Sequence, residues 1–139
     1  MDLKERVLEQ IRDLSLPDNV KVLMGYLDGK QGDPEVRLQM LPGSNIIDVD
    51  YAGNKTEQYL MEVIAQGSDE GLINQVLWQI ANALGDNDFR VISKDGSFIF
   101  SKLEIASLPH PTMADTTGAV TYVFDFKITV DTFAKKKEG

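Results

Sequence analysis

Hydrophobic and polar residues alternate with a period of two over residues 119–131. The even-numbered positions are apolar or aromatic, whereas most odd-numbered positions carry Thr, Asp or Lys. Successive side chains of a strand point to opposite faces, so this pattern predicts one long strand. One of its faces is expected to lie on a core and the other to face water or a partner. The apolar positions are Val120, Tyr122, Phe124, Phe126, Ile128 and Val130.

Two other stretches, 2–14 and 69–84, place apolar residues at spacings of three and four. This spacing puts the apolar side chains on one side of an amphipathic helix. We expect Ser68 to cap the start of the second helix and Gly85 to end it. The first apolar stripe comprises Leu3, Val7, Leu8, Ile11 and Leu14, and the second comprises Leu72, Ile73, Val76, Leu77, Ile80 and Leu84.

The remaining apolar runs are short and are bounded by turn residues. They predict strands over 20–27, 36–40, 46–51, 56–66, 89–93 and 98–106. Residues 52–55 and 94–97 are expected to form the turns of two hairpins. The order of elements predicts an α+β fold, with a largely antiparallel or mixed sheet and two helices packed on it. We expect one domain over 1–133, a flexible basic tail over 134–139, and mobile loops over 28–34 and 107–118 in the free protein.

Composition narrows the functional classes. The 139 residues are 42% hydrophobic, carry a formal charge of −8 and include no cysteine. Tight nucleic-acid binding is disfavoured because it needs clustered Lys and Arg, and thiolate metal sites and disulfides are excluded. No apolar run approaches the ~20 residues that span a bilayer. The amino end leads into an amphipathic helix instead of an apolar signal, so we expect a soluble, unexported protein with no membrane partner.

The chain has one histidine, His110, between two prolines. A histidine can act as a general base when a carboxylate orients it and a nucleophile is near. Ser107 and Asp115 lie in the same predicted loop, but no spacing marks a catalytic triad. A loop or contact role for His110 is therefore favoured over catalysis.

Asp48 and Asp50 are expected on the same face of one strand. Paired carboxylates can bind a divalent cation or share a proton. No further ligand is fixed nearby, so a solvated strand face is favoured. The sequence predicts no enzyme and no cofactor.

Trp78 lies opposite the apolar stripe of the second helix, beside Asn74 and Asn82. Exposed tryptophans are enriched as anchors of protein interfaces. The alternative is that the first helix or a loop covers this side, which would make Trp78 a core residue. The pattern leaves both interpretations open.

Six segments together resemble a known family. They are the amphipathic opening helix 2–14, the turn Leu41–Gly43, the hairpin arm Glu57–Ile64, the helix 69–84 ending Gln79–Leu84, the run Lys102–Pro111, and the strand Gly118–Val130. In order and character they resemble the small phage minor capsid proteins that act as tail terminators at the head–tail junction. The resemblance covers about residues 1–133, and it rests on no invariant chemical motif.

The resemblance implies an α+β protomer that assembles into a homo-oligomeric ring, commonly a hexamer, within the virion. The ring would cap the tail tube and dock on the head connector, while DNA passes through its channel without specific binding. No catalysis or cofactor is implied. The family offers no motif to transfer, so the candidate contact residues are chosen on chemical grounds. They are Trp78, Asn74, Asn82, Pro109, His110, Asp125 and Lys127.

Three alternatives remain open. The first is another neck protein, such as a head- or tail-completion factor. The second is a small hydrolase or metal-dependent enzyme that uses His110 or the pair Asp48 and Asp50. The third is a ligand-binding module with a pocket between helix and sheet, lined by Tyr59, Tyr122 or Phe124.

Overall fold

The computed structural model describes residues 2–17, 20–24, 34–42, 45–112 and 120–133. Within these ranges it contains two helices and one six-stranded mixed sheet, which confirms the predicted α+β fold. The elements in chain order are α1 (Leu3–Arg12), β1 (Lys21–Met24), β2 (Glu35–Met40), β3 (Asn45–Val49), β4 (Lys55–Gly67), α2 (Glu70–Leu84), β5 (Phe98–Pro111) and β6 (Val120–Thr132).

The sheet is built around the paired long strands β4 and β6. These two strands pair antiparallel over their full lengths, from Lys55 opposite Thr132 to Gly67 opposite Val120. The strand order is β1-β2-β4-β6-β5, with β1 and β2 parallel. β3 pairs with the first half of β4, beyond the end of β2. The sheet therefore has β3 and β5 at opposite edges of one end.

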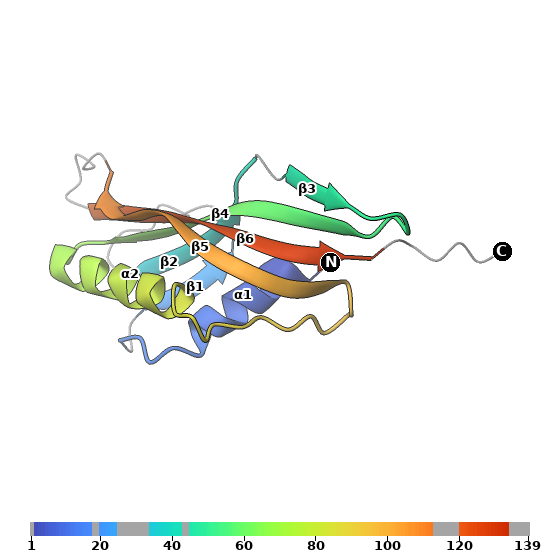
Figure 1. Cartoon of the computed structure of the whole chain (residues 1–139). Helices are drawn as coiled ribbons and strands as arrows, with labels where there is room; N and C mark the ends of the chain where they lie inside the picture. The colour runs from blue at the N-terminus through green and yellow to red at the C-terminus, as the bar shows by residue number, and fades with distance from the viewer. Residues whose placement is uncertain (1, 18–19, 25–33, 43–44, 113–119, 134–139) are drawn as a thin grey trace.

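Both helices cover the same face of the sheet (Figure 1). α1 packs on β1 and β2, and α2 packs on β4, β5 and β6. The even-numbered residues of β6 from Tyr122 to Val130 point into this layer and are buried, whereas Val120 and Thr132 at its ends are half-buried. Burial of each large apolar side chain contributes about 1.5–3 kcal/mol, so this face holds the core. The predicted two-faced character of 119–131 is confirmed.

The helices follow their predicted stripes closely. Most predicted stripe residues are buried, and only Leu14 and Leu72 are half-buried. Asp69, and not Ser68 as predicted, caps α2: its carboxylate accepts a hydrogen bond from Leu72 N at 3.2 Å. Gly85 ends the helix as predicted. Neither described helix has the length and apolar character needed to cross a membrane.

The predicted strand over 89–93 is wrong. The backbone of this segment pairs with β5 only through one isolated bridge, Ile92 to Ile99, within the described residues. The Ile92 carbonyl accepts a hydrogen bond from Arg6 Nε at 2.6 Å, so a side chain of α1 takes the place of a strand partner. The hairpin predicted around residues 94–97 is therefore a looser connection into β5.

The predicted loop over 107–118 is wrong at its start, because β5 continues to Pro111. Among the described strands, β5 pairs only with β6, so it forms an edge of the sheet. Proline lacks an N–H donor, but an edge strand tolerates it because one side of the strand needs no ladder partner. Residues 113–118, the predicted loop positions 28–33 and the predicted tail 134–139 lie outside the described residues.

Candidate functional site

A row of polar side chains crosses the sheet face that bears no helix. Gln39 of β2, Glu62 of β4, Asp125 of β6 and Ser107 of β5 occupy successive register positions. Gln39 Nε2 donates a hydrogen bond to Glu62 Oε1 at 2.6 Å. Asp125 N donates to Ser107 Oγ at 3.0 Å. The open face of the sheet therefore has an ordered polar centre.

Glu62 and Asp125 place two carboxylates opposite each other at this centre. Partial burial raises the pKa of Glu62, and the charge of Asp125 and a hydrogen bond with it raise that pKa further. Asp125 Oδ1 and Gln39 Oε1 are buried and have no hydrogen-bond partner within the described part of the chain. The row can therefore hold a proton between its acids or accept donors from a partner.

Sequence reasoning selected Asp125 but missed Gln39 and Glu62. Both were visible as polar residues inside apolar runs, with Glu62 between Met61 and Val63. The missing information was the strand order, which places β2, β4 and β6 side by side. Neither run by itself shows that their polar positions meet.

His110 lies on the same open face, opposite Val123 of β6. Its side chain is exposed, and Nδ1 lies 2.8 Å from the Leu108 carbonyl. Ser107 Oγ is engaged by the Asp125 backbone. Asp115, the other proposed partner of His110, lies outside the described residues. In the described part of the chain, no group of three His, Asp or Glu side chains could hold a metal ion.

Lys127 belongs to a short row of alternating charge on the open face. It is exposed and pairs in register with Glu104 of β5. Glu104 lies 2.8 Å from Lys102 Nζ. A hydrogen bond from Lys102 and the charges of Lys102 and Lys127 lower the pKa of Glu104. The half-buried Pro109 lies farther along β5.

Trp78 lies on the side of α2 that faces away from the core cluster. It is 36% exposed, with half-buried Asn74 and exposed Asn82 on the same side. A neighbouring residue, Gln79, donates a hydrogen bond to the Ser15 carbonyl at 2.9 Å. The structure thus places Trp78 at the surface, outside the set of buried residues that forms the core.

The predicted contact residues therefore form two groups on opposite faces of the molecule. Asn74, Trp78 and Asn82 lie on the outer side of α2, beneath the sheet. Asp125, Lys127 and His110 lie on the open face, which bears no described helix (Figure 1). The structure brings each group together but does not bring the two groups together.

The expected pairing of Asp48 and Asp50 on one strand face is wrong, because β3 ends at Val49. Asp50 instead organises the turn that follows: its Oδ1 accepts hydrogen bonds from Ala52 N and Asn54 N, each at 2.9 Å. These hydrogen bonds, with that from Asn54 first, lower the pKa of Asp50. Its carboxylate serves the turn and is not a free ligand.

The three aromatic residues considered for a ligand pocket have packing roles. Phe124 is fully buried in the core. Tyr59 donates its hydroxyl hydrogen to Glu57 at 3.0 Å, and Tyr122 donates to Glu70 at 2.9 Å. Burial, followed by the Glu57 contact, raises the pKa of Tyr59 to about 12.

Two exposed apolar edges of the sheet were not predicted from the sequence. β3 exposes more than half of each of three apolar side chains: Ile46, Ile47 and Val49. At the opposite edge of the same end of the sheet, Ile92 is 72% exposed and Ile99 is 57% exposed. Alternation alone cannot reveal these edges, because it assigns one face of each run to a core without saying how far the helices reach.

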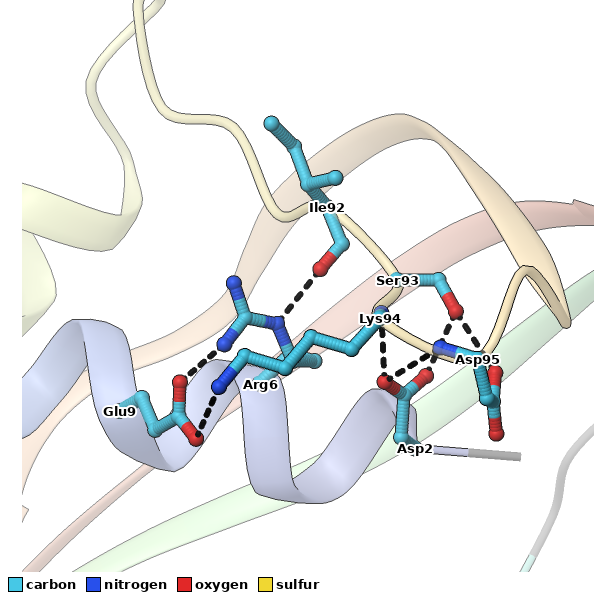
Figure 2. Close-up of polar contacts among 7 residues, drawn as sticks. All are labelled: Asp2, Arg6, Glu9, Ile92, Ser93, Lys94 and Asp95. Atoms are coloured by element: carbon cyan, nitrogen blue, oxygen red, sulfur yellow. Dashed lines mark hydrogen bonds and ion pairs between the residues drawn. The ribbon is translucent and has the colours of Figure 1, made fainter.

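The segment that carries Ile92 is fixed to the start of α1 (Figure 2). The Asp2 carboxylate accepts hydrogen bonds from Ser93 Oγ and Lys94 N, each at 2.7 Å. Although desolvation opposes the charged form, these two hydrogen bonds lower the pKa of Asp2. Arg6 holds the Ile92 carbonyl and also pairs with Glu9. The Ile92 edge is therefore an ordered surface.

Comparisons with known proteins show a likeness in fold. No family model and no curated protein sequence matches the chain. A solved structure described as "Virion of native gene transfer agent (GTA) particle" contains a chain of similar fold, with a TM-score of 0.62 and 13% sequence identity. The match covers 93% of this chain and 94% of that chain. At this identity the likeness shows a shared fold over nearly the whole length of both chains.

Proposed function

We propose that this chain is a structural component of a phage or phage-like particle. The observation that carries the proposal is the shared fold with a chain of a gene transfer agent virion, which extends over nearly the full length of both proteins. Its role would be assembly rather than catalysis.

Within the particle, we propose the role of tail terminator at the head–tail junction. A ring of identical copies, possibly six, would cap the tail tube, stop its growth and offer a docking surface to the head connector. The formal charge of −8 suits a channel through which DNA passes without specific binding, because acidic walls repel phosphates.

Deletion of the gene in a particle-producing cell tests this role. We expect filled heads without attached tails, together with tail tubes of excess and variable length, in negative-stain micrographs. Restoring the gene should restore joined particles with one tail length. Normal particles after deletion would contradict the proposal.

Another neck role is the second candidate, because the comparison names a virion and no position within it. Binding assays with the purified tail-tube and connector proteins separate the two roles. A terminator should bind the end of assembled tubes, whereas a head-completion factor should bind only the connector. Deletion of a head-completion factor should leave tail length unchanged.

A further inference from the structure

The β3 edge is unusually apolar for a surface that faces water. Ile46, Ile47 and Val49 are 54%, 55% and 52% exposed. Ile46 and Val49 lie on the core side of the sheet, because their partners Glu57 and Lys55 share a face with the buried residues of β4. Ile47 occupies the register shift between Ile46 and Asp48. Among the described strands, β3 pairs only with β4, so its other edge is open to a partner.

The opposite edge offers a matching apolar hollow. A register row crosses the sheet from Asp48 through Thr56 and Asp131 to Ile99, which connects the two edges through four strands. At its far end, Ile92 bridges Ile99 and leaves both side chains exposed. The hollow here is lined by Val91, Ile92, Phe98, Ile99 and Phe100, with Arg90 and Ser93. Figure 1 shows β3 along one side of this end of the sheet and the start of β5 along the other.

The charges beside the two edges are opposite in sign. Asp48 and Asp50 flank the apolar residues of β3, whereas Arg90 and Lys94 flank Ile92. Each edge also carries charges of the other sign: Lys55 lies beside β3, and Asp2, Asp95 and Asp131 lie beside Ile92 and Ile99. The Asp95 carboxylate is already occupied, since Ser97 and Ser93 donate to it and hold its pKa well below its ordinary value. Lys94 forms an exposed ion pair with Glu9 at 3.6 Å, and its side chain is 70% exposed, so an acidic partner can still reach it.

From these observations we infer that β3 of one copy docks on the Ile92–Ile99 edge of the next copy of this chain. The apolar residues would cover each other, with Asp48 and Asp50 beside Arg90 and Lys94. The two surfaces differ and lie on opposite edges, so the contact is head-to-tail and can repeat around a closed ring. The inferred contact names the residues that would join the copies of the proposed ring. It rests on the proposed function only for the role that the ring performs.

Light scattering after size-exclusion chromatography tests the contact with two single variants. Ile47→Asp disables the β3 edge, and Ile92→Asp disables the other edge. Each should weaken self-association at least about tenfold, because a carboxylate would be buried in an apolar contact. Both positions are exposed, so melting temperatures should stay near that of the unchanged protein. Leu108→Asp is the matched control, since Leu108 is 61% exposed and lies in the other half of β5; it should leave self-association unchanged.

Mixing the two disabled variants gives a sharper outcome. One intact contact remains between the unchanged Ile92 edge of Ile47→Asp and the unchanged β3 edge of Ile92→Asp. An equimolar mixture should therefore form heterodimers and nothing larger. A ring formed by either variant alone, or a mixture that stays monomeric, would overturn the inference. So would an unchanged protein that stays monomeric at high concentration.

A charge exchange provides an independent check. Asp48→Lys and Arg90→Glu should each weaken self-association at least about tenfold through like-charge contacts, and the double variant should recover most of the loss. If the double variant does not recover self-association, the predicted contact between Asp48 of one copy and Arg90 of the next is wrong.

Failure of this contact and failure of the proposed function give different results. If the unchanged protein caps tail tubes and Ile47→Asp caps them equally well, the contact is wrong and the function stands. If the ring forms through these edges but does not affect tubes, the contact stands and the terminator role is wrong.

Discussion

Glu62 and Asp125 face each other across adjacent strands, which is an unfavourable arrangement for two carboxylates. Gln39 relieves part of the cost by donating a hydrogen bond to Glu62. The raised pKa of Glu62 means that the folded state binds this proton more tightly than the unfolded chain does. The two adjacent carboxylates therefore lower the stability of the folded state, and a partner that donates hydrogen bonds to them would reduce this destabilisation.

Replacement of Glu62 by Gln should stabilise the protein at pH 7 by roughly 0.5–1 kcal/mol, because the like-charge pair is removed. The stabilisation should be lost in acid. The cost of Glu62 is absent below the ordinary glutamate pKa of 4.5 and is fully present above its raised folded value. The gain should therefore disappear near pH 4. Urea unfolding at both pH values measures this, and a Glu62→Gln variant less stable than the unchanged protein at pH 7 would contradict it.

Trp78 provides a second prediction at this scale. Because it is 36% exposed and outside the core, Trp78→Ala should lower the free energy of unfolding by about 1 kcal/mol or less. Leu77→Ala, one residue earlier and fully buried, should cost about 2–5 kcal/mol. Thermal melting of both variants tests the contrast. Equal losses would mean that Trp78 is a core residue; a folded Trp78→Ala variant that assembles poorly would make it an interface anchor.

Elements far apart in the chain are joined by the start of α1. Asp2 and Arg6 hold the segment 92–94, which places the Ile92 edge against the first helix (Figure 2). This connection explains why residues 89–93 did not become a strand despite their apolar character. Arg6 binds the Ile92 carbonyl and Asp2 binds the Lys94 N–H. In a strand, these backbone groups would form hydrogen bonds with a neighbouring strand.

Asp2→Asn tests this connection. The variant should lose about 1 kcal/mol of stability at pH 7, because the neutral amide accepts hydrogen bonds from Ser93 and Lys94 less strongly. Asp2 has a lowered pKa, so its contribution is present above the ordinary value of 3.8 and is lost as the pH falls through its folded value. The difference between the two proteins should therefore vanish in strong acid. Glu5→Gln, an exposed acid in the same helix, is the control for charge alone.

The sequence predicted the elements with strong periodicity and missed features set by neighbours. The alternation in β6 and the stripes of both helices are local, so they were readable. The extension of β5 through Pro109 depends on its position at the edge of the sheet, which no local pattern reveals. The meeting of Gln39, Glu62 and Asp125 depends on strand order in the same way. Gln39 and Glu62, half of the polar row, could therefore not be assigned to the candidate site without knowledge of the strand order.

At the scale of the whole molecule, one face of the sheet carries the core and both helices, and the other face is open and polar. The end of the sheet beyond the helices carries two apolar edges of opposite charge character. In a monomer these apolar edges stay in contact with water, whereas a repeating assembly would bury them and use their charges to select the partner surface. The chain shares its fold with a chain of a gene transfer agent virion.

Growth of tail tubes in the presence of this protein is the most direct test of its proposed role. The tail-tube protein of the same particle would be polymerised with and without the chain, and tube lengths would be measured by negative-stain electron microscopy. We expect the protein to arrest growth and to appear as extra density at one end of each tube. Tubes that reach the same length in both samples, with no density at their ends, would contradict the account.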